Sequence, residues 1–141
     1  MGFQDLSDND LDRPLTEPAL VANVLDLVIS AADRRAGAIG VLMCDPDGRL
    51  VQPAVIGELK PDPTDEDRDR LVSVFVEAMG GHGSLLLAIA RRDGLSISPD
   101  DVAWCHAASR VCAGSGVRFL GAYVVTMTGS REVPDGDAVA V

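Results

Sequence analysis

The segment "SLLLAIARRDGLSISPDDVAWC", residues 84–105, decides the fold. Its first seven residues form an unbroken apolar run, which is typical of a central strand covered on both faces. A loop follows, and Ser98-Pro99 then predicts the start of a helix, with the serine as its N-cap and the proline in its first turn. Apolar and small residues recur at helical spacing after that point, at Val102, Cys105, Ala108, Ser109 and Cys112.

The residues before this segment predict a β-hairpin. "AIGVLMC" (38–44) is a buried strand, and "DPDG" (45–48) is a turn with proline at its second place and glycine at its last. "RLVQPAVIG" (49–57) is the returning strand. Pro53 has no N–H to donate to a ladder, so this strand is expected at a sheet edge or at a bulge.

A first helix is expected ahead of the hairpin. Thr16 has the chemistry of an N-cap, Pro18 suits the first turn, and Gly37 ends the segment. Arg34 and Arg35 then lie at the negative end of the helix, where the macrodipole favours cations. The apolar residues between these ends are at helical spacing, at Leu20, Val24, Leu27, Val28 and Ala31.

The remaining elements complete a single sheet. A second helix follows the acidic segment 60–70 and ends at Gly80, and its apolar face comprises Leu71, Val72, Phe75, Val76 and Met79. The third helix ends at "GSG" (114–116), and a strand over 117–127 and a short last strand follow. The sequence therefore predicts an α/β fold with one mixed β-sheet flanked by three helices, in the order helix–hairpin–helix–strand–helix–strand–strand.

The 141 residues suffice for one domain with a substantial core. We expect residues 16–133 to form that domain, residues 1–15 a flexible acidic arm, and residues 134–141 a flexible tail.

The composition indicates which classes of partner are unfavourable for this chain. The formal net charge of -10 repels phosphate backbones, so no nucleic-acid partner is expected. No apolar run reaches the ~18 residues that span a bilayer, and the acidic start is unlike a signal peptide, so we expect a cytoplasmic protein without a membrane partner. The three cysteines have no metal-type spacing, which indicates free thiols and no cofactor.

Ser98-x-x-Asp101 has two interpretations. It is a capping box variant, with Asp100 and Asp101 at the positive end of the third helix. The order of elements, together with this motif, also resembles the JAB/MPN family, including its RadC-like bacterial branch. Active members of that family carry a glutamate on the first strand, then His-x-His, seven residues and Ser-x-x-Asp.

The resemblance implies a degenerate member of the family. The His-x-His positions fall on Ala88 and Ala90, and Gly37 stands where the glutamate would be. Two imidazoles and a carboxylate would hold zinc in an active member, and the glutamate would take a proton from its water. We therefore expect no zinc here, a non-catalytic domain, and Ser98 and Asp101 as remnants of the motif. The resemblance implies a role in protein interaction or dimerisation, with a protein partner or a second copy.

Other candidate contact residues come from position alone. Arg91, Arg92 and Asp93 leave the end of the central strand, where α/β sheets commonly bind ligands or partners. Trp104, on the outer side of the third helix, would suit an interface anchor. Cys105 and His106 are adjacent on a helix and point about 100° apart, which disfavours a nucleophile and base.

Two alternatives remain open. Residues 24–57 are similar to the opening of a GAF-type sensor domain, which would contain a closed apolar pocket of a few hundred cubic ångströms between sheet and helices. A hydrolase with an unrecognised site would instead need convergent polar residues with perturbed pKa values in a cleft.

Overall fold

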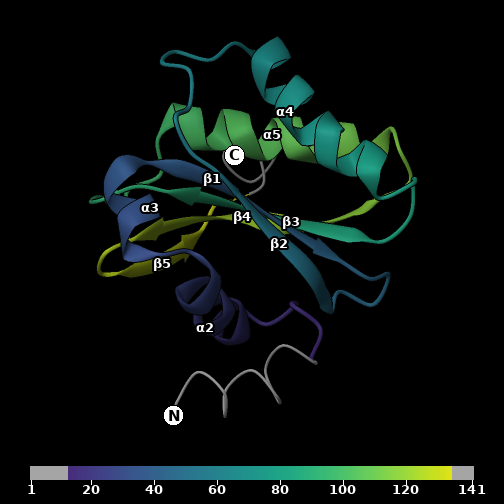
Figure 1. Cartoon of the computed structure of the whole chain (residues 1–141), viewed down its shortest axis with the longest axis horizontal. Helices are drawn as coiled ribbons and strands as arrows, with labels where there is room; N and C mark the ends of the chain where they lie inside the picture. Colours follow the sequence, from purple (N-terminus) through teal and green to yellow (C-terminus); the bar gives the residue numbers. More distant parts are fainter. Residues whose placement is uncertain (1–12, 135–141) are drawn as a thin grey trace.

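A five-stranded mixed sheet lies between two layers of helices (Figure 1). The computed structural model describes residues 13–134, so most of the expected N-terminal arm and nearly all of the expected tail lie outside the described residues. The helices are α2 (Pro18–Val28), α3 (Ala31–Ala36), α4 (Asp65–Ala78) and α5 (Pro99–Ala113). The strands are β1 (Ala38–Cys44), β2 (Leu50–Ile56), β3 (Ser84–Ala90), β4 (Arg118–Thr126) and β5 (Gly129–Glu132).

The strand order is β2-β1-β3-β4-β5, so β3 is the middle strand, as its unbroken apolar run predicts. β3 and β4 are parallel and are joined by α5, whereas the other neighbouring pairs are antiparallel. β2 is an edge strand, which confirms the expectation from Pro53, and its pairing with β1 shifts by one residue beside Cys44. Proline and a bulge are both tolerated at such an edge.

Alternate residues of β3 divide the core into two parts. Leu85, Leu87 and Ile89 pack on the side of α4 and α5. Leu86, Ala88 and Ala90 pack on the opposite side, with α2. Figure 1 shows the same division, with α4 and α5 together on one face and α2 on the other.

Close packing of β1 against the α2–α3 connection requires a glycine. An ideal Cβ on Gly40 would lie 2.8 Å from Ile29 Cδ1 and 3.2 Å from the Cβ of Ala88. Ile29 is only 1% exposed, so its side chain fills the space that a larger residue at position 40 would need.

The expected helix over residues 16–36 is broken into α2 and α3, so residues 13–134 contain four helical segments where the sequence predicts three. Glu17, not Thr16, is the N-cap of α2, and α2 ends at Val28. Ile29 is extended, and Ser30 then caps α3 by accepting a hydrogen bond of 3.1 Å from the backbone N–H of Asp33. A serine that bonds the backbone competes with continuous helix, and burial of Ile29 above Gly40 stabilises the break.

Leu15 also differs from expectation. The sequence places it in the flexible arm, but it is 1% exposed and packs in the core beside α2. Its backbone N–H donates to the carbonyl oxygen of Gly48 at 2.9 Å, so the hairpin turn holds the chain on this side. None of the helices within residues 13–134 is long and apolar enough to cross a membrane.

Candidate functional site

Arg91 and Asp101 close the loop between β3 and α5. Arg91 Nη1 lies 2.7 Å from Asp101 Oδ1, and the same guanidinium donates to the carbonyl oxygens of Gly94 and Ser96 at 2.8 Å each. The other carboxylate oxygen of Asp101 accepts the backbone N–H of Ser98, whose hydroxyl accepts the N–H of Asp101. The capping box is therefore present, and Asp101, 1% exposed, uses both of its oxygens inside the fold.

Arg92 and Asp93 lie outside this network. Their side chains are 72% and 83% exposed, and their contact with each other is a long ion pair of 4.0 Å. Such an exposed pair contributes little to stability. The sequence singles out three charged residues at this strand end. Of these, Arg91 is the one whose side chain is held by several hydrogen bonds, and these bonds stabilise the loop between β3 and α5.

The helix N-termini at this end of the sheet are neutralised by the chain itself. Arg68 Nη1 lies 2.9 Å from Asp65, in the first turn of α4, and Nη2 lies 2.6 Å from Asp100, in the first turn of α5. Hydrogen bonds from the Thr64 backbone and from Lys60 lower the pKa of Asp67 to about 2. Carboxylates thus occupy the positions where a bound anion would otherwise be favoured.

Trp104 does not lie on the outer side of its helix, where it would suit an interface anchor. It is 4% exposed, and the Arg68 guanidinium lies 5.8 Å from the centre of its ring, a cation–π distance. The reason is the contact between α4 and α5, which covers that side of the helix. Trp104 reaches the surface only as part of an apolar groove.

That groove has a volume of about 330 Å³ and lies between α4 and the loop before it. Its walls are mostly apolar, and its charged members, Lys60, Asp67 and Arg70, each have an ion-pair partner. Its lining residues are Leu59, Lys60, Pro63, Asp67, Arg70, Leu71, Val74 and Trp104. Sequence reasoning missed this groove because its lining comes from three separate segments.

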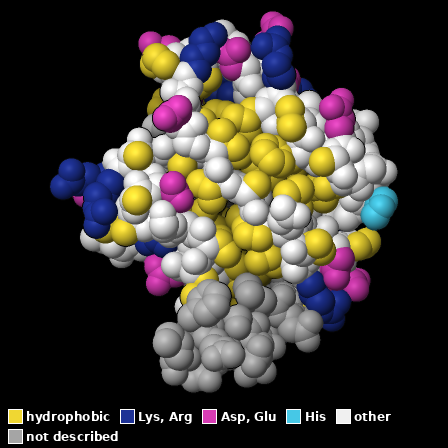
Figure 2. Space-filling model, viewed as in Figure 1, with side chains coloured by type: hydrophobic (Ala, Val, Ile, Leu, Met, Phe, Trp, Pro, Cys, Tyr) yellow, Lys and Arg dark blue, Asp and Glu magenta, His cyan; other side chains and the backbone are white. Residues whose placement is uncertain are grey.

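The surface beside the groove is also apolar. Val51 on β2 is 70% exposed, and Val74 on α4 is 58% exposed. Val51 lines a second hollow of about 300 Å³, together with Met43, Ala78 and Met79. Figure 2 shows hydrophobic side chains gathered in the centre of this face, below α4, with charged side chains around the margin.

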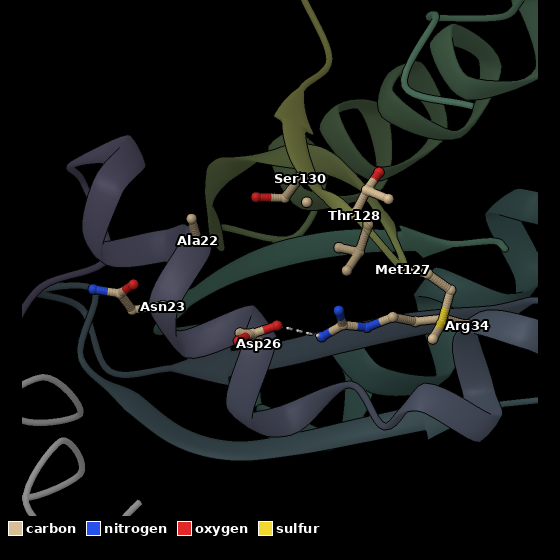
Figure 3. Close-up of a pocket in the computed structure, with 9 residues that line it drawn as sticks. Ala22, Asn23, Asp26, Arg34, Met127, Thr128 and Ser130 are labelled. Atoms are coloured by element: carbon tan, nitrogen blue, oxygen red, sulfur yellow. Dashed lines mark hydrogen bonds and ion pairs between the residues drawn. The ribbon is translucent and has the colours of Figure 1, made fainter. Parts of the chain in front are cut away.

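A polar pocket of about 380 Å³ opens between α2 and β5 (Figure 3). Arg34 lies at one side of it, in the last turn of α3, and is only 7% exposed. Its guanidinium donates to the carbonyl oxygens of Leu25, Ile29 and Thr126 and to Asp26 Oδ1 at 3.1–3.3 Å. Arg34 therefore links α2 and α3 to the end of β4. The pocket is open and polar, so it is not the closed apolar cavity expected of a GAF-type sensor.

A smaller hollow of about 230 Å³ brings Cys105 and His106 together with Ser109, Gly121 and Glu132. Glu132, on β5, could not be placed here from sequence spacing. Cys105 is 5% exposed, whereas His106 is exposed. Burial raises the pKa of Cys44 to about 12 and that of Cys112 to about 11, so these two thiols are held in their neutral form.

The positions that the resemblance to JAB/MPN domains singles out lie on different sides of the sheet. Ala88 and Ala90 pack with α2, whereas Asp101 begins α5, which covers the other face. Within residues 13–134, no three His, Cys, Asp or Glu side chains gather closely enough to hold a metal ion. The molecule is an α/β domain with a mixed sheet, and no family model, curated protein or solved structure matches this chain.

Proposed function

We propose that this chain is a non-catalytic interaction module that binds a protein through the face formed by β2 and α4. One observation supports the proposal: α4, the loop before it and Trp104 form an apolar groove lined by the exposed side chain of Val74, and the exposed Val51 lines a second hollow against the end of α4. Exposed apolar surface of this kind, rimmed by charged residues, is typical of protein interaction sites.

The proposal includes a distant relation to JAB/MPN domains. Its support is the order of elements and Ser98-x-x-Asp101, and the non-catalytic part is supported by the residues at the motif positions. Ala88, Ala90 and Gly37 offer no metal ligand or base. The carboxylate of Asp101 is already bonded to Arg91 and to the N–H of Ser98. The net charge of -10 supports a protein partner over a nucleic acid.

Site-specific photocrosslinking tests the proposed face. A photoreactive phenylalanine analogue is placed at Val74 or at Val51, and at Met127 as the control, because Met127 is an exposed apolar residue at the polar pocket beside α2. In cells that express the chain, positions 74 and 51 should give protein crosslinks, to this chain or to another, and position 127 should not. Equal labelling at all three positions, or none at 74 and 51, would contradict the proposal.

A further inference from the structure

We propose that the partner is a second copy of this chain, with the two α4 helices antiparallel around a two-fold axis at Val74. This inference rests on the proposed interaction function and names its occupant. α4 presents to solvent a stripe of Glu66, Arg70, Val74 and Glu77, spaced three or four residues apart. Val74, the apolar member of the stripe, is 58% exposed and lines the groove that contains Trp104.

Glu77 is the first sign of a missing partner. It is exposed in the last turn of α4, which contains no basic residue. The carbonyl end of a helix is its negative end, so an acid there is unfavourable unless a cation is near. Among residues 13–134 no hydrogen bond or ion pair reaches the Glu77 side chain, and its backbone carbonyl accepts the N–H of Gly80 at 3.1 Å.

A two-fold axis at Val74 supplies the cation. In an antiparallel pair, residues before Val74 on one helix face residues after Val74 on the other. Arg70, four residues before Val74, then comes beside Glu77, three residues after it, on the second copy, and symmetry makes the contact twice. A parallel pairing in register would instead place Arg70 against Arg70 and Glu77 against Glu77, so the charges select the antiparallel arrangement.

The groove gives this contact its apolar part. Packed helices approach to about 8–10 Å between axes, so a second α4 would lie over Leu71 and Val74 and would cover the adjacent groove. Arg70 is 68% exposed and pairs with Glu66, one turn away, at 2.7 Å. Glu66 is also exposed, so if Arg70 turns toward the second copy, Glu66 stays solvated and no buried charge loses its partner. The net charge of -10 on each copy makes the two copies repel each other. At 0.1 M salt this repulsion is largely screened beyond about 10 Å.

Charge exchange on α4 tests the pairing by sedimentation equilibrium of the full chain between about 1 and 200 μM in 0.15 M salt. We expect a dimer of the 14.8 kDa chain. Val74→Asp should give a monomer, whereas Met127→Asp, the matched control away from α4, should leave the dimer intact. Arg70→Glu alone and Glu77→Arg alone should each weaken the dimer at least tenfold.

The double variant Arg70→Glu with Glu77→Arg should restore the dimer, because the exchanged charges again attract across the axis. Circular dichroism of every variant checks that the fold is kept. A monomer at all concentrations would overturn the inference, as would a dimer that Val74→Asp leaves intact or a double variant without recovery. The chain could also be monomeric and crosslink from position 74 to a different protein. That result would contradict the dimer but would still support the interaction function.

Discussion

Arg91 Nη1 and Asp101 Oδ1 lie 2.7 Å apart at the end of the central strand, and the carboxylate is 1% exposed. The pair stands where α/β domains commonly bind ligands, yet each of its members is bonded to the loop between β3 and α5. The end of the central strand is where the topology favours a binding site. In this protein the charged pair at that place instead holds the loop between β3 and α5. Arg91→Met should therefore act on stability.

We expect Arg91→Met to lower the free energy of unfolding by about 3 kcal/mol, because it leaves a buried carboxylate without its cation. Urea denaturation measures this change. Arg92→Met is the matched control, since its side chain is 72% exposed, and it should stay within about 0.5 kcal/mol of the parent protein. Equal effects of the two substitutions would contradict the structural role of Arg91.

Ser98→Ala should lower the free energy of unfolding by about 0.5–2 kcal/mol, because the hydroxyl accepts the backbone N–H of Asp101 at 3.1 Å. Chemical denaturation checks the loss. Ser109→Ala, at an exposed position on the same helix, is the control and should change stability by no more than about 0.5 kcal/mol. An unchanged midpoint for Ser98→Ala would mean that the capping box does not stabilise α5.

Gly40→Ala should destabilise the fold by about 1–3 kcal/mol, since its Cβ would meet Ile29 Cδ1 at 2.8 Å. Ile29→Val removes that methyl group and by itself costs about 0.5–1.5 kcal/mol. The double variant should lose less stability than the sum of the two single losses, and thermal or urea unfolding of all four proteins measures this coupling. Strictly additive losses would show that Ile29 does not limit residue 40.

Asp67→Asn tests the acid dependence of the α4 cap. The pKa of Asp67 is lowered from 3.8 to about 2 in the folded protein, so its charge adds stability above about pH 4, and this contribution disappears as the pH falls toward 2. The variant should be less stable than the parent at pH 6, and the difference should shrink on acidification. A constant difference between pH 6 and pH 2 would exclude this linkage.

The purified protein should hold no stoichiometric zinc, and EDTA should leave its melting temperature unchanged. The physical reason is that Ala88 and Ala90 have no lone pair to offer, and that both oxygens of Asp101 are already bonded. Metal analysis and a thermal melt with and without chelator make the test. About one zinc per chain, with a lower melting temperature in EDTA, would contradict a non-catalytic JAB/MPN-like domain.

The two buried strands and the N-cap of α5 could be predicted from sequence because their signals are local, whereas the caps of α2 and α3 differ from the sequence prediction. The apolar runs 38–44 and 84–90 match β1 and β3 residue for residue, and Ser98 caps α5 as its motif predicts. The break at Ile29 could not be predicted, because it depends on Gly40, which is distant in sequence but in contact across the core. Burial of Trp104 likewise depends on the packing of α4 against α5. The helical spacing of apolar residues does not predict which helices pack together.

The candidate site was predicted less well than the fold, for a related reason. Charge and position at the end of β3 marked Arg91, Arg92 and Asp93, but neither reveals which charges are already bonded within the fold. The apolar groove is assembled from the segment 59–63, from α4 and from Trp104 on α5. No single stretch of sequence contains its pattern, so only the packed structure brings it into view.

The edge strand β2 limits what kind of assembly this face can build. Pro53 offers no N–H to an incoming strand, and the register shift beside Cys44 interrupts the ladder at the same edge. A neighbouring chain therefore cannot form an uninterrupted ladder of backbone hydrogen bonds along β2. The proposed pairing through α4 would end after two copies, because an interface around a two-fold axis leaves no free copy of itself on the dimer.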